Sequence, residues 1–180
     1  MRQIRPKLLD QAGLRELALK ALSARAHSAA ELRTKLRRRA AEPNDIDGVM
    51  ASLKEYGYLN DKQFAETYAY GRLNSEGHGS GRVLRDLRRK QVAAPVAEAA
   101  VKDTFAGTDE VELIEKYLAR KFRNVDLHKL LADPKKLTSV FGRLRYAGFA
   151  SGPAIGVLKR YASGAGELEG LEEVEAPEDE

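Results

Sequence analysis

The sequence predicts an all-α protein made of three tandem three-helix repeats. Nine main segments place apolar residues at spacings of three and four, the period of an amphipathic helix, and none shows convincing strand alternation. A basic octet also occurs twice, as LRTKLRRR at 32–39 and VLRDLRRK at 83–90, an offset of 51 residues. This duplication indicates a repeated unit, and units this small bury their apolar stripes by packing internally or against a neighbour.

The first repeat is predicted over residues 14–59. Its first helix carries an apolar stripe that starts at Leu14. Ser28 and Glu31 form a capping-box pattern at the start of the second helix, where a hydroxyl and a carboxylate each bond a backbone amide of the first turn. The third helix is predicted to begin after Asn44 and to end at Gly57, a candidate left-handed cap.

The second repeat is predicted over residues 60–106. Asn60 precedes its first helix, and a loop is expected at 74–81. The second basic octet follows as a helix. Pro95 then stands near the start of the third helix, where its missing amide hydrogen does no harm.

The third repeat is predicted over residues 107–162. Its first helix begins after Thr108, and a short segment, 127–131, intervenes before the next one. The Asp133-Pro134 pair predicts a helix start, because an aspartate cap followed by proline suits the first turn. Ser151 is predicted to cap the last helix.

Charge is distributed unevenly along the chain. Residues 1–161 contain 31 basic and 19 acidic residues, a net charge of +12, whereas the last nineteen residues contain eight acids and no Lys or Arg. A basic body favours an anionic partner, either nucleic acid or an acidic protein surface. Outside the repeats, 1–13 is an N-terminal segment and 163–180 an acidic tail. The tail is predicted to be disordered, and either solubilises the chain or competes with the anionic partner.

Several classes of protein are disfavoured by composition. No run approaches the roughly 18 apolar residues of a membrane span, and the N-terminus lacks the apolar core of a signal peptide. The absence of cysteine excludes disulfides and thiolate metal sites, and fits the cytoplasm. His27, His78 and His128 are too far apart to suggest a metal site, so His27 and His78 are given structural roles. We predict no metal and no cofactor.

Catalytic motifs are also missing from the sequence. Residues 77–81, GHGSG, match neither a dinucleotide-binding loop nor a nucleophile elbow, and no strand precedes them, so a flexible turn is the better interpretation. No nucleophile–base pair stands out, and an enzyme is the least supported class. Tyr58 and Tyr68 are predicted to lie in the core rather than to stack on bases.

The repeated basic helices are the predicted functional surface. Leu32 and Leu36 define the buried face of the first one, which leaves Arg38 pointing nearly opposite. Cations at a helix C-terminus are stabilised by about 0.3–1 kcal/mol each, but that effect accounts poorly for three basic residues at both helix ends. Arg37, Arg88 and Arg145 are predicted to form a repeated contact row. The full set of candidate partner-binding residues is Arg33, Arg37, Arg38, Arg39, Arg82, Arg85, Arg88, Arg89, Lys90, Arg143 and Arg145.

Short motifs along the chain resemble a known family. The stretch 55–61, EYGYLND, followed by Phe64-Ala65, resembles the central signature of the RecX regulatory proteins. Further matching positions are His27-Ser28, Glu31-Leu32, Lys35-Leu36, Gly79, Arg82-Val83, Leu87, Lys90 and the segment 144–149, LRYAGF. The resemblance covers roughly residues 14–161. One departure is Gln91, because the family usually has glycine after this lysine, so this helix end is expected not to use a left-handed glycine.

The resemblance implies a modulator of the RecA recombinase, acting in homologous recombination, DNA repair and the SOS response. Such proteins are elongated, curved arrays of three-helix repeats that lie in the groove of the RecA–DNA filament and inhibit its ATPase and strand exchange. The implied partner is the RecA filament, with weak direct contact to DNA, no membrane, and a monomeric state in the cytoplasm. The alternative is a nucleic-acid-binding module of the helix-turn-helix type. Against it, the Ala40–Asn44 connection is long and no single helix resembles a recognition helix.

Overall fold

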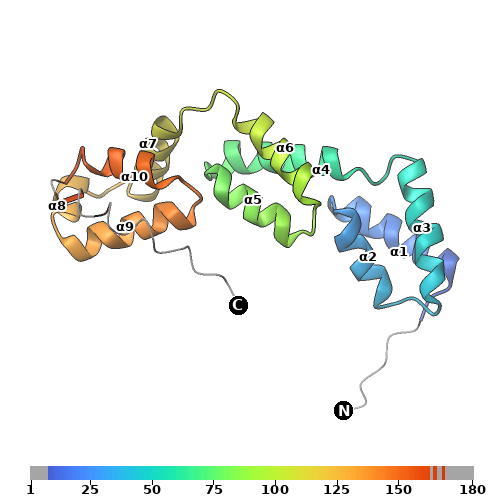
Figure 1. Ribbon diagram of the computed structural model, residues 1–180. Coiled ribbons are helices and arrows are strands. Elements are labelled where there is room, and N and C mark those ends of the chain that lie inside the picture. The colour runs from blue at the N-terminus through green and yellow to red at the C-terminus, as the bar shows by residue number, and fades with distance from the viewer. Residues whose placement is uncertain (1–7, 163, 166–167, 169–180) are drawn as a thin grey trace, which may run out of the picture. The chain divides into compact units, whose positions relative to one another are not determined.

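Ten α-helices and one π-helical turn form the secondary structure of the residues described by the computed structural model, 8–162, 164–165 and 168 (Figure 1). Within those residues the only β-type pairing is a single bridge between Leu9 and Ala40. The predicted all-α class is confirmed. Among the described helices, none combines the length and the apolar character needed to cross a membrane. Of the tail predicted to be disordered, residues 163, 166–167 and 169–180 lie outside the described part.

The chain divides into two compact units. The first comprises Met1–Tyr68 and Leu87–Ala100, and the second comprises Ala69–Asp86 and Val101–Glu180. The second predicted repeat therefore contributes residues to both units. The repeat boundaries drawn from the sequence stay a prediction.

The first unit contains a three-helix bundle of α1 (Gln11–Ala24), α2 (Ala29–Arg37) and α3 (Pro43–Glu55), which pack pairwise (Figure 1). Their buried faces are the apolar stripes that the sequence shows. The core residues are Leu14, Ala18, Ala21, Leu32, Leu36, Ile46, Val49, Met50, Leu53 and Leu59.

Local signals explain where these helices begin. Asp10 accepts a hydrogen bond from the Gly13 amide at 2.9 Å, so α1 starts earlier than its apolar stripe. The predicted capping box is confirmed: Ser28 Oγ accepts from the Glu31 amide at 3.1 Å, and the Ser28 amide donates to the Glu31 carboxylate at 3.3 Å. Pro43 is the first residue of α3, slightly before the predicted start.

The second repeat forms four elements: α4 (Asp61–Gly71), the π-helical turn η1 (Arg72–Glu76), α5 (Ser80–Arg89) and α6 (Ala94–Phe105). The loop predicted at 74–81 is therefore wrong over much of its length. Gly71 keeps a helical backbone, with φ −61° and ψ −42°, and Arg72 pairs with Glu76 one turn later. The helical path consequently continues to Gly77, whose φ of +58° ends it.

The C-terminal end of α5 uses an unusual residue. Gln91 has a φ of +57° and is the one non-glycine with positive φ among the described residues. Its amide donates to the Arg88 carbonyl at 2.8 Å, and the Val92 amide donates to the Leu87 carbonyl at 3.1 Å. As expected, no glycine ends this helix, yet the left-handed conformation is kept with glutamine in its place.

Replacing this glutamine should stabilise the protein. We expect Gln91→Gly to raise the free energy of unfolding by about 0.5–1 kcal/mol, because an L-residue pays roughly 1–2 kcal/mol in the left-handed region and glycine does not. Urea denaturation followed by circular dichroism measures the change. An unfolding midpoint lower than that of the wild type would contradict this account of the helix end.

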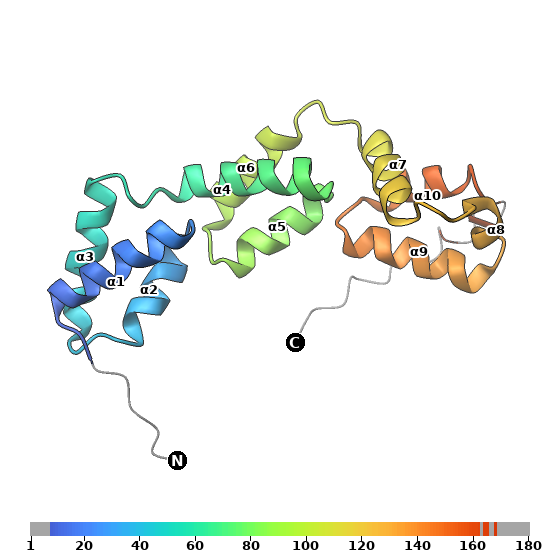
Figure 2. The same cartoon turned by 180° about the vertical axis from the view of Figure 1, so that it is seen from behind.

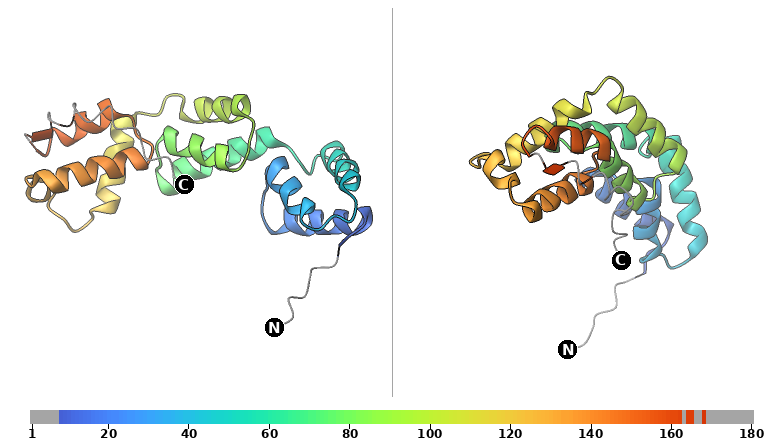
Figure 3. Two further views of the ribbon diagram at one scale, coloured as in Figure 1. Left: turned by 60° about the horizontal axis from the view of Figure 1, so that its bottom comes forward. Right: turned by 60° about the vertical axis from the view of Figure 1, so that its left-hand side comes forward.

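The second unit contains a bundle of α7 (Glu110–Lys121), α8 (Leu127–Leu131), α9 (Pro134–Tyr146) and α10 (Ser151–Leu158). α10 packs against α7 and lies along α9, and α8 packs on α9 (Figures 2 and 3). The fully or nearly buried residues of this core include Ile114, Leu118, Leu131, Leu144, Phe149, Ala154, Val157, Leu158, Ala165 and Leu168.

Two helix starts in this unit test the sequence signals. Asp133 caps α9 as predicted, accepting from the Lys135 amide at 2.9 Å. The prediction that Ser151 caps α10 is wrong, because Ser151 is already the first helical residue and Ala150 precedes it without a side-chain cap. The Ala150 amide instead donates to Glu110 at 2.8 Å, so a carboxylate from α7 holds this helix entry.

The glycine-rich segment 77–81 packs against the end of α9. The Gly79 amide donates to the Ala147 carbonyl at 2.9 Å, and the Gly81 amide donates to the Gly148 carbonyl at 3.0 Å. A Cβ atom on Gly79 would stand 2.4 Å from the Gly148 oxygen. The glycines therefore allow the backbone of this segment to approach the backbone at the end of α9 closely. The turn predicted here packs against that helix end.

Candidate partner-binding groove

Basic side chains from both copies of the octet line one groove in the first unit. The groove has a volume of about 650 Å³ and lies among the end of α1, the helix α2 and the end of α5. We call it the basic groove. Its lining residues are Ala21, Ala24, Arg25, His27, Glu31, Thr34, Lys35, Arg38, Arg89 and Gln91. Four cations and one acid give the lining a formal charge of +3.

Arg38 and Arg89 hold equivalent places in the two octets, 51 residues apart. Arg38 is the C-cap that directly follows α2, and Arg89 is the last residue of α5. Both are exposed. The internal duplication has thus brought two matching guanidinium groups to the wall of a single groove, where each offers a planar fork of donors suited to phosphate or carboxylate.

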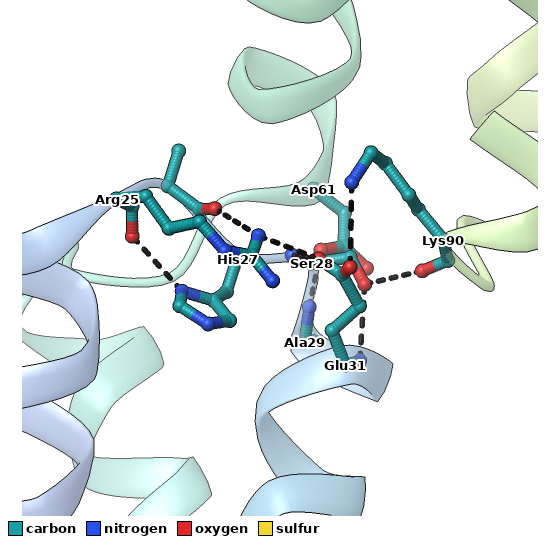
Figure 4. Close-up of polar contacts among 8 residues, drawn as sticks. Arg25, His27, Ser28, Ala29, Glu31, Asp61 and Lys90 are labelled. Carbon is teal, nitrogen blue, oxygen red and sulfur yellow. Dashed lines mark hydrogen bonds and ion pairs between the residues drawn. The ribbon is translucent and has the colours of Figure 1, made fainter. Parts of the chain in front are cut away.

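A polar joint holds the helix ends that form the groove (Figure 4). The buried Ser28 donates its hydroxyl to the Lys90 carbonyl at 2.5 Å, across 62 residues of sequence. The Ala29 amide donates to the Asp61 carboxylate at 2.7 Å, so the start of α4 also caps α2. Lys90 Nζ lies 3.4 Å from Glu31 Oε1. These contacts fix the end of α5 beside the start of α2.

Glu31 is the one acid of the groove lining, and its neighbours keep it ionised. Burial raises the pKa of its carboxyl, but the hydrogen bond from the Ser28 amide and the charges of Arg25 and Lys90 outweigh burial, so the pKa is lowered. Arg25 Nη1 lies 3.4 Å from Glu31 Oε2. Glu31 therefore offsets part of the positive charge of the groove at neutral pH.

His27 lies at the edge of the groove with only 7% of its surface exposed. Its Nδ1 is 2.9 Å from the Arg25 carbonyl oxygen. Burial lowers the pKa of the imidazole, and the charges of Arg25 and Lys35 lower it further, although the backbone contact and Glu31 act the other way. The neutral ring is favoured by the fold, which fits the structural role predicted for it.

Stability should consequently fall in mild acid. The ordinary pKa of histidine is about 6.5, so between that value and the lower pKa of folded His27 the unfolded chain binds more protons. We expect the melting temperature to drop as the pH falls from about 7.5 to about 5.5. His27→Gln should weaken this pH dependence. The part that comes from His78 should remain, because burial lowers the pKa of His78 as well. An unchanged pH profile in His27→Gln would assign the effect to other groups.

The remaining candidate residues of the first unit lie outside the groove. Arg33 pairs with Asp47 at 2.6 Å, and Arg88 pairs with Glu98 at 3.3 Å. Arg37 is exposed and Arg39 half-buried. Lys90 belongs to the polar joint rather than to the groove wall.

Lys90 is further held by aromatic rings. Its ammonium lies 5.2 Å from the ring centroid of Tyr68 and 5.9 Å from that of Phe64. Tyr68 is half-buried, whereas Tyr58, predicted to be in the core, is 58% exposed. The Tyr58 prediction is wrong because the chain leaves α3 through Gly57, whose φ is +73°, and Leu59 rather than Tyr58 enters the core.

The candidate residues of the second unit have structural contacts of their own. Arg82 lies over the Tyr146 ring at 4.5 Å, and Arg85 donates to the Tyr146 carbonyl at 2.6 Å. Arg145 donates to the Phe149 carbonyl at 2.6 Å and is half-buried. Arg82 also pairs with Asp86 at 3.2 Å, and Arg143 lies over the Phe122 ring at 5.6 Å.

The three residues of the predicted contact row therefore differ in surroundings. Arg37 is exposed, and Arg88 has an exposed carboxylate partner. Arg145 donates a hydrogen bond to the Phe149 carbonyl, just after the end of α9. Sequence reasoning also missed two cations of the groove, Arg25 and Lys35. The signal for Lys35 is its position one helical turn before Arg38, which puts both on one face.

In the part of the chain that the structure describes, no group of three or more His, Cys, Asp or Glu side chains gathers in a way that could hold a metal ion.

Family models and individual relatives of this chain point to the same family. Residues 15–53 match the family model of the first three-helix domain of RecX, and residues 60–101 match that of the second. The chain is 31% identical over 134 residues to the regulatory protein RecX of Syntrophotalea carbinolica, covering 74% of this chain and 86% of that one. It is 30% identical over 136 residues to that of Vibrio vulnificus, covering 76% and 84%.

A solved structure supports the fold. The crystal structure of RecX from Lactobacillus salivarius superimposes with a TM-score of 0.63 at 20% identity, over 84% of this chain and 96% of that one. Sequence and fold agree over most of the length of these relatives. The chain belongs to the RecX family of regulatory proteins.

Proposed function

We propose that this chain regulates the RecA recombinase by binding the RecA–DNA filament through the basic groove, and that it inhibits the filament's ATPase and strand exchange without catalysis of its own. It acts in the cytoplasm as a monomer. The other candidate residues of the basic helices, including Arg37 and Arg88, contribute electrostatic attraction around the groove.

One observation carries this proposal: Arg38 and Arg89, matched residues of a duplicated octet, line the same groove. Solvated helix ends alone give no reason for the two copies to converge. Membership of a family of regulatory proteins supports regulation, and the +3 charge of the groove lining supports an anionic target such as a nucleoprotein filament.

A helix-turn-helix reader of duplex DNA is less well supported. The connection from Arg37, the end of α2, to Pro43, the start of α3, exceeds the three or four residues typical of that turn. In a helix-turn-helix made of α2 and α3, the second helix α3 would be the recognition helix, and no residue of α3 lines the basic groove.

Sedimentation with assembled filaments tests the proposal. RecA is polymerised on single-stranded DNA with a slowly hydrolysed ATP analogue, and the protein should co-sediment with the filament and slow strand exchange. Naked DNA at the same nucleotide concentration is the control. If the protein stays in the supernatant with filaments and strand exchange proceeds normally, the proposal is wrong.

A further inference from the structure

A pocket of about 430 Å³ lies in the second unit, between α8, the start of α9 and the chain that follows α10. Most of its lining is apolar. The lining residues are His128, Leu131, Ala132, Pro134, Leu137, Thr138, Tyr161, Ala162, Gly164 and Leu168. We call it the C-terminal pocket, and it shares no lining residue with the basic groove.

We infer that the acidic segment 169–180 of the same chain docks in the C-terminal pocket, with Leu171 and Val174 as the apolar side chains that enter it. The acids of the segment then lie over the basic surface of the bundle that forms the pocket. The inference goes beyond the proposed function, because it assigns an intramolecular ligand to a site in the second unit and requires no recombinase.

The chain after α10 returns to the core and forms one wall of the pocket. Ala165 and Leu168, which fall in the stretch predicted as tail, are 0% and 3% exposed and belong to the core of the second unit. His128 Nδ1 lies 3.2 Å from the Tyr161 carbonyl oxygen, and the two rings are 5.2 Å apart, so α8 holds the start of this stretch. Segment 169–180 therefore continues directly from a residue of the pocket wall, Leu168.

This position in the chain favours segment 169–180 over any separate ligand. Leu171 follows Leu168 by three residues, and three residues span at most about 11 Å even when fully extended. A group on so short a tether has an effective concentration on the order of millimolar at the pocket. A second copy of the chain, or another protein, would have to reach that concentration in solution to compete.

The residue pattern of the segment suits an apolar pocket with basic surroundings. Leu168, Leu171 and Val174 recur every three positions, a spacing that places apolar side chains on one side of a helical segment. Segment 169–180 contains seven acids and no Lys or Arg. Residues 126–161, which include α8, α9 and α10, contain seven Lys or Arg and two Asp, a net charge of +5 with histidine neutral. Apolar contact and charge attraction therefore favour the same docked state.

Docking also screens the third bundle from other anions. Seven acids more than offset a net charge of +5, so the docked segment removes the attraction of this bundle for an anionic partner. Lys135 and Lys136, in the first turn of α9 beside the pocket residue Pro134, are exposed. They become available to an anion when the segment leaves the pocket.

Nitroxide labelling followed by NMR tests the inference on the full chain. The sequence contains no cysteine, so Ala176→Cys gives a single attachment point two residues beyond Val174. The label should broaden the amide resonances of Leu131, Leu137 and Thr138, which line the pocket. Adding Leu171→Ser with Val174→Ser keeps every charge and should remove most of this broadening. Equal broadening with and without the serine substitutions, or no broadening at these three residues, would overturn the inference.

A mixing experiment separates the chain's own segment from that of a second copy. Spin-labelled chain without isotope is mixed with isotope-labelled chain that carries no nitroxide, so that only contacts between copies are detected. The pocket resonances should stay sharp. Broadening as strong as in the doubly labelled chain would make a second copy the occupant and overturn the inference.

The screening effect is measured with a short heparin fragment as the anionic probe at low salt. The amide resonances of Lys135 and Lys136 should shift more in the Leu171→Ser, Val174→Ser variant than in the wild type, although the two chains have the same charge. Circular dichroism melting verifies that the variant folds. Equal shifts in the two chains would contradict the screening effect of the docked segment.

Discussion

Gly148→Ala should lower the free energy of unfolding by about 3 kcal/mol or more, the largest stability effect that we expect from one substitution. Gly148 has a φ of +92°, which an L-residue adopts only with strain. A Cβ atom there would stand 2.0 Å from the Arg82 amide nitrogen and 2.6 Å from the Arg82 Cβ. Since both the end of α9 and the start of α5 would have to move, the hydrogen bond from Gly81 to Gly148 should be lost.

Chemical denaturation of the full chain measures this effect, with Gly142→Ala as the matched control. Gly142 lies inside α9, and a Cβ atom there meets nothing within 4 Å. Alanine is favoured over glycine inside a helix by about 0.5–1 kcal/mol, so the control should be slightly stabilised. If Gly148→Ala unfolded at the wild-type denaturant concentration, the close approach of Gly148 to Arg82 at the start of α5 would not matter for stability.

Reversing Arg38 and Arg89 to Glu should weaken binding to the RecA–DNA filament by on the order of a hundredfold, at a cost of about 1.4 kcal/mol per reversed contact. The reversal turns a groove lining of +3 into one of −1. Affinity should also become less sensitive to salt, because fewer attractive pairs remain to be screened. Both side chains are exposed, so the melting temperature should change little.

The control for this experiment is the reversal of Arg37 and Arg88, which alters charge equally beside the groove. It should weaken filament binding less than the groove pair does, through general attraction alone. Biolayer interferometry on immobilised filaments compares the two variants. A greater loss with the Arg37 and Arg88 reversal would place the contact on the row of Arg37, Arg88 and Arg145 instead of in the groove. A large drop in melting temperature with binding intact would show that Arg38 and Arg89 have a structural role.

The helices of this protein could be predicted largely because their signals are local. The capping box of Ser28 and Glu31 and the cap of Asp133 each depend on residues within one turn, and each is observed. Ser151 failed as a cap because the helix entry is held by Glu110, forty residues away, which no local pattern reveals. The loop predicted at 74–81 was wrong because glycine permits a helical backbone as well as a turn. Gly71 keeps the helical conformation, so the helical path continues into η1.

The basic groove could not be predicted from the sequence. Helical periodicity gives the direction of Arg38 relative to Leu32, but it gives no information on which other helix end faces it. That pairing depends on the bond from Ser28 to the Lys90 carbonyl, which spans 62 residues. The repeat offset did contain a usable hint, since Arg38 and Arg89 are equivalent positions. Hence the arginines were predicted as candidates, whereas their convergence, and the participation of Arg25, needed the structure.

The central claim, regulation of the recombinase filament, is tested most directly by the ATPase activity of RecA on single-stranded DNA as this protein is titrated in. The account predicts that hydrolysis falls at substoichiometric or near-stoichiometric amounts of the wild type, and that the Arg38 and Arg89 reversal variant requires far more protein. Unchanged ATP hydrolysis and strand exchange, together with tight binding of the protein to free DNA, would contradict it and favour a direct nucleic-acid-binding module.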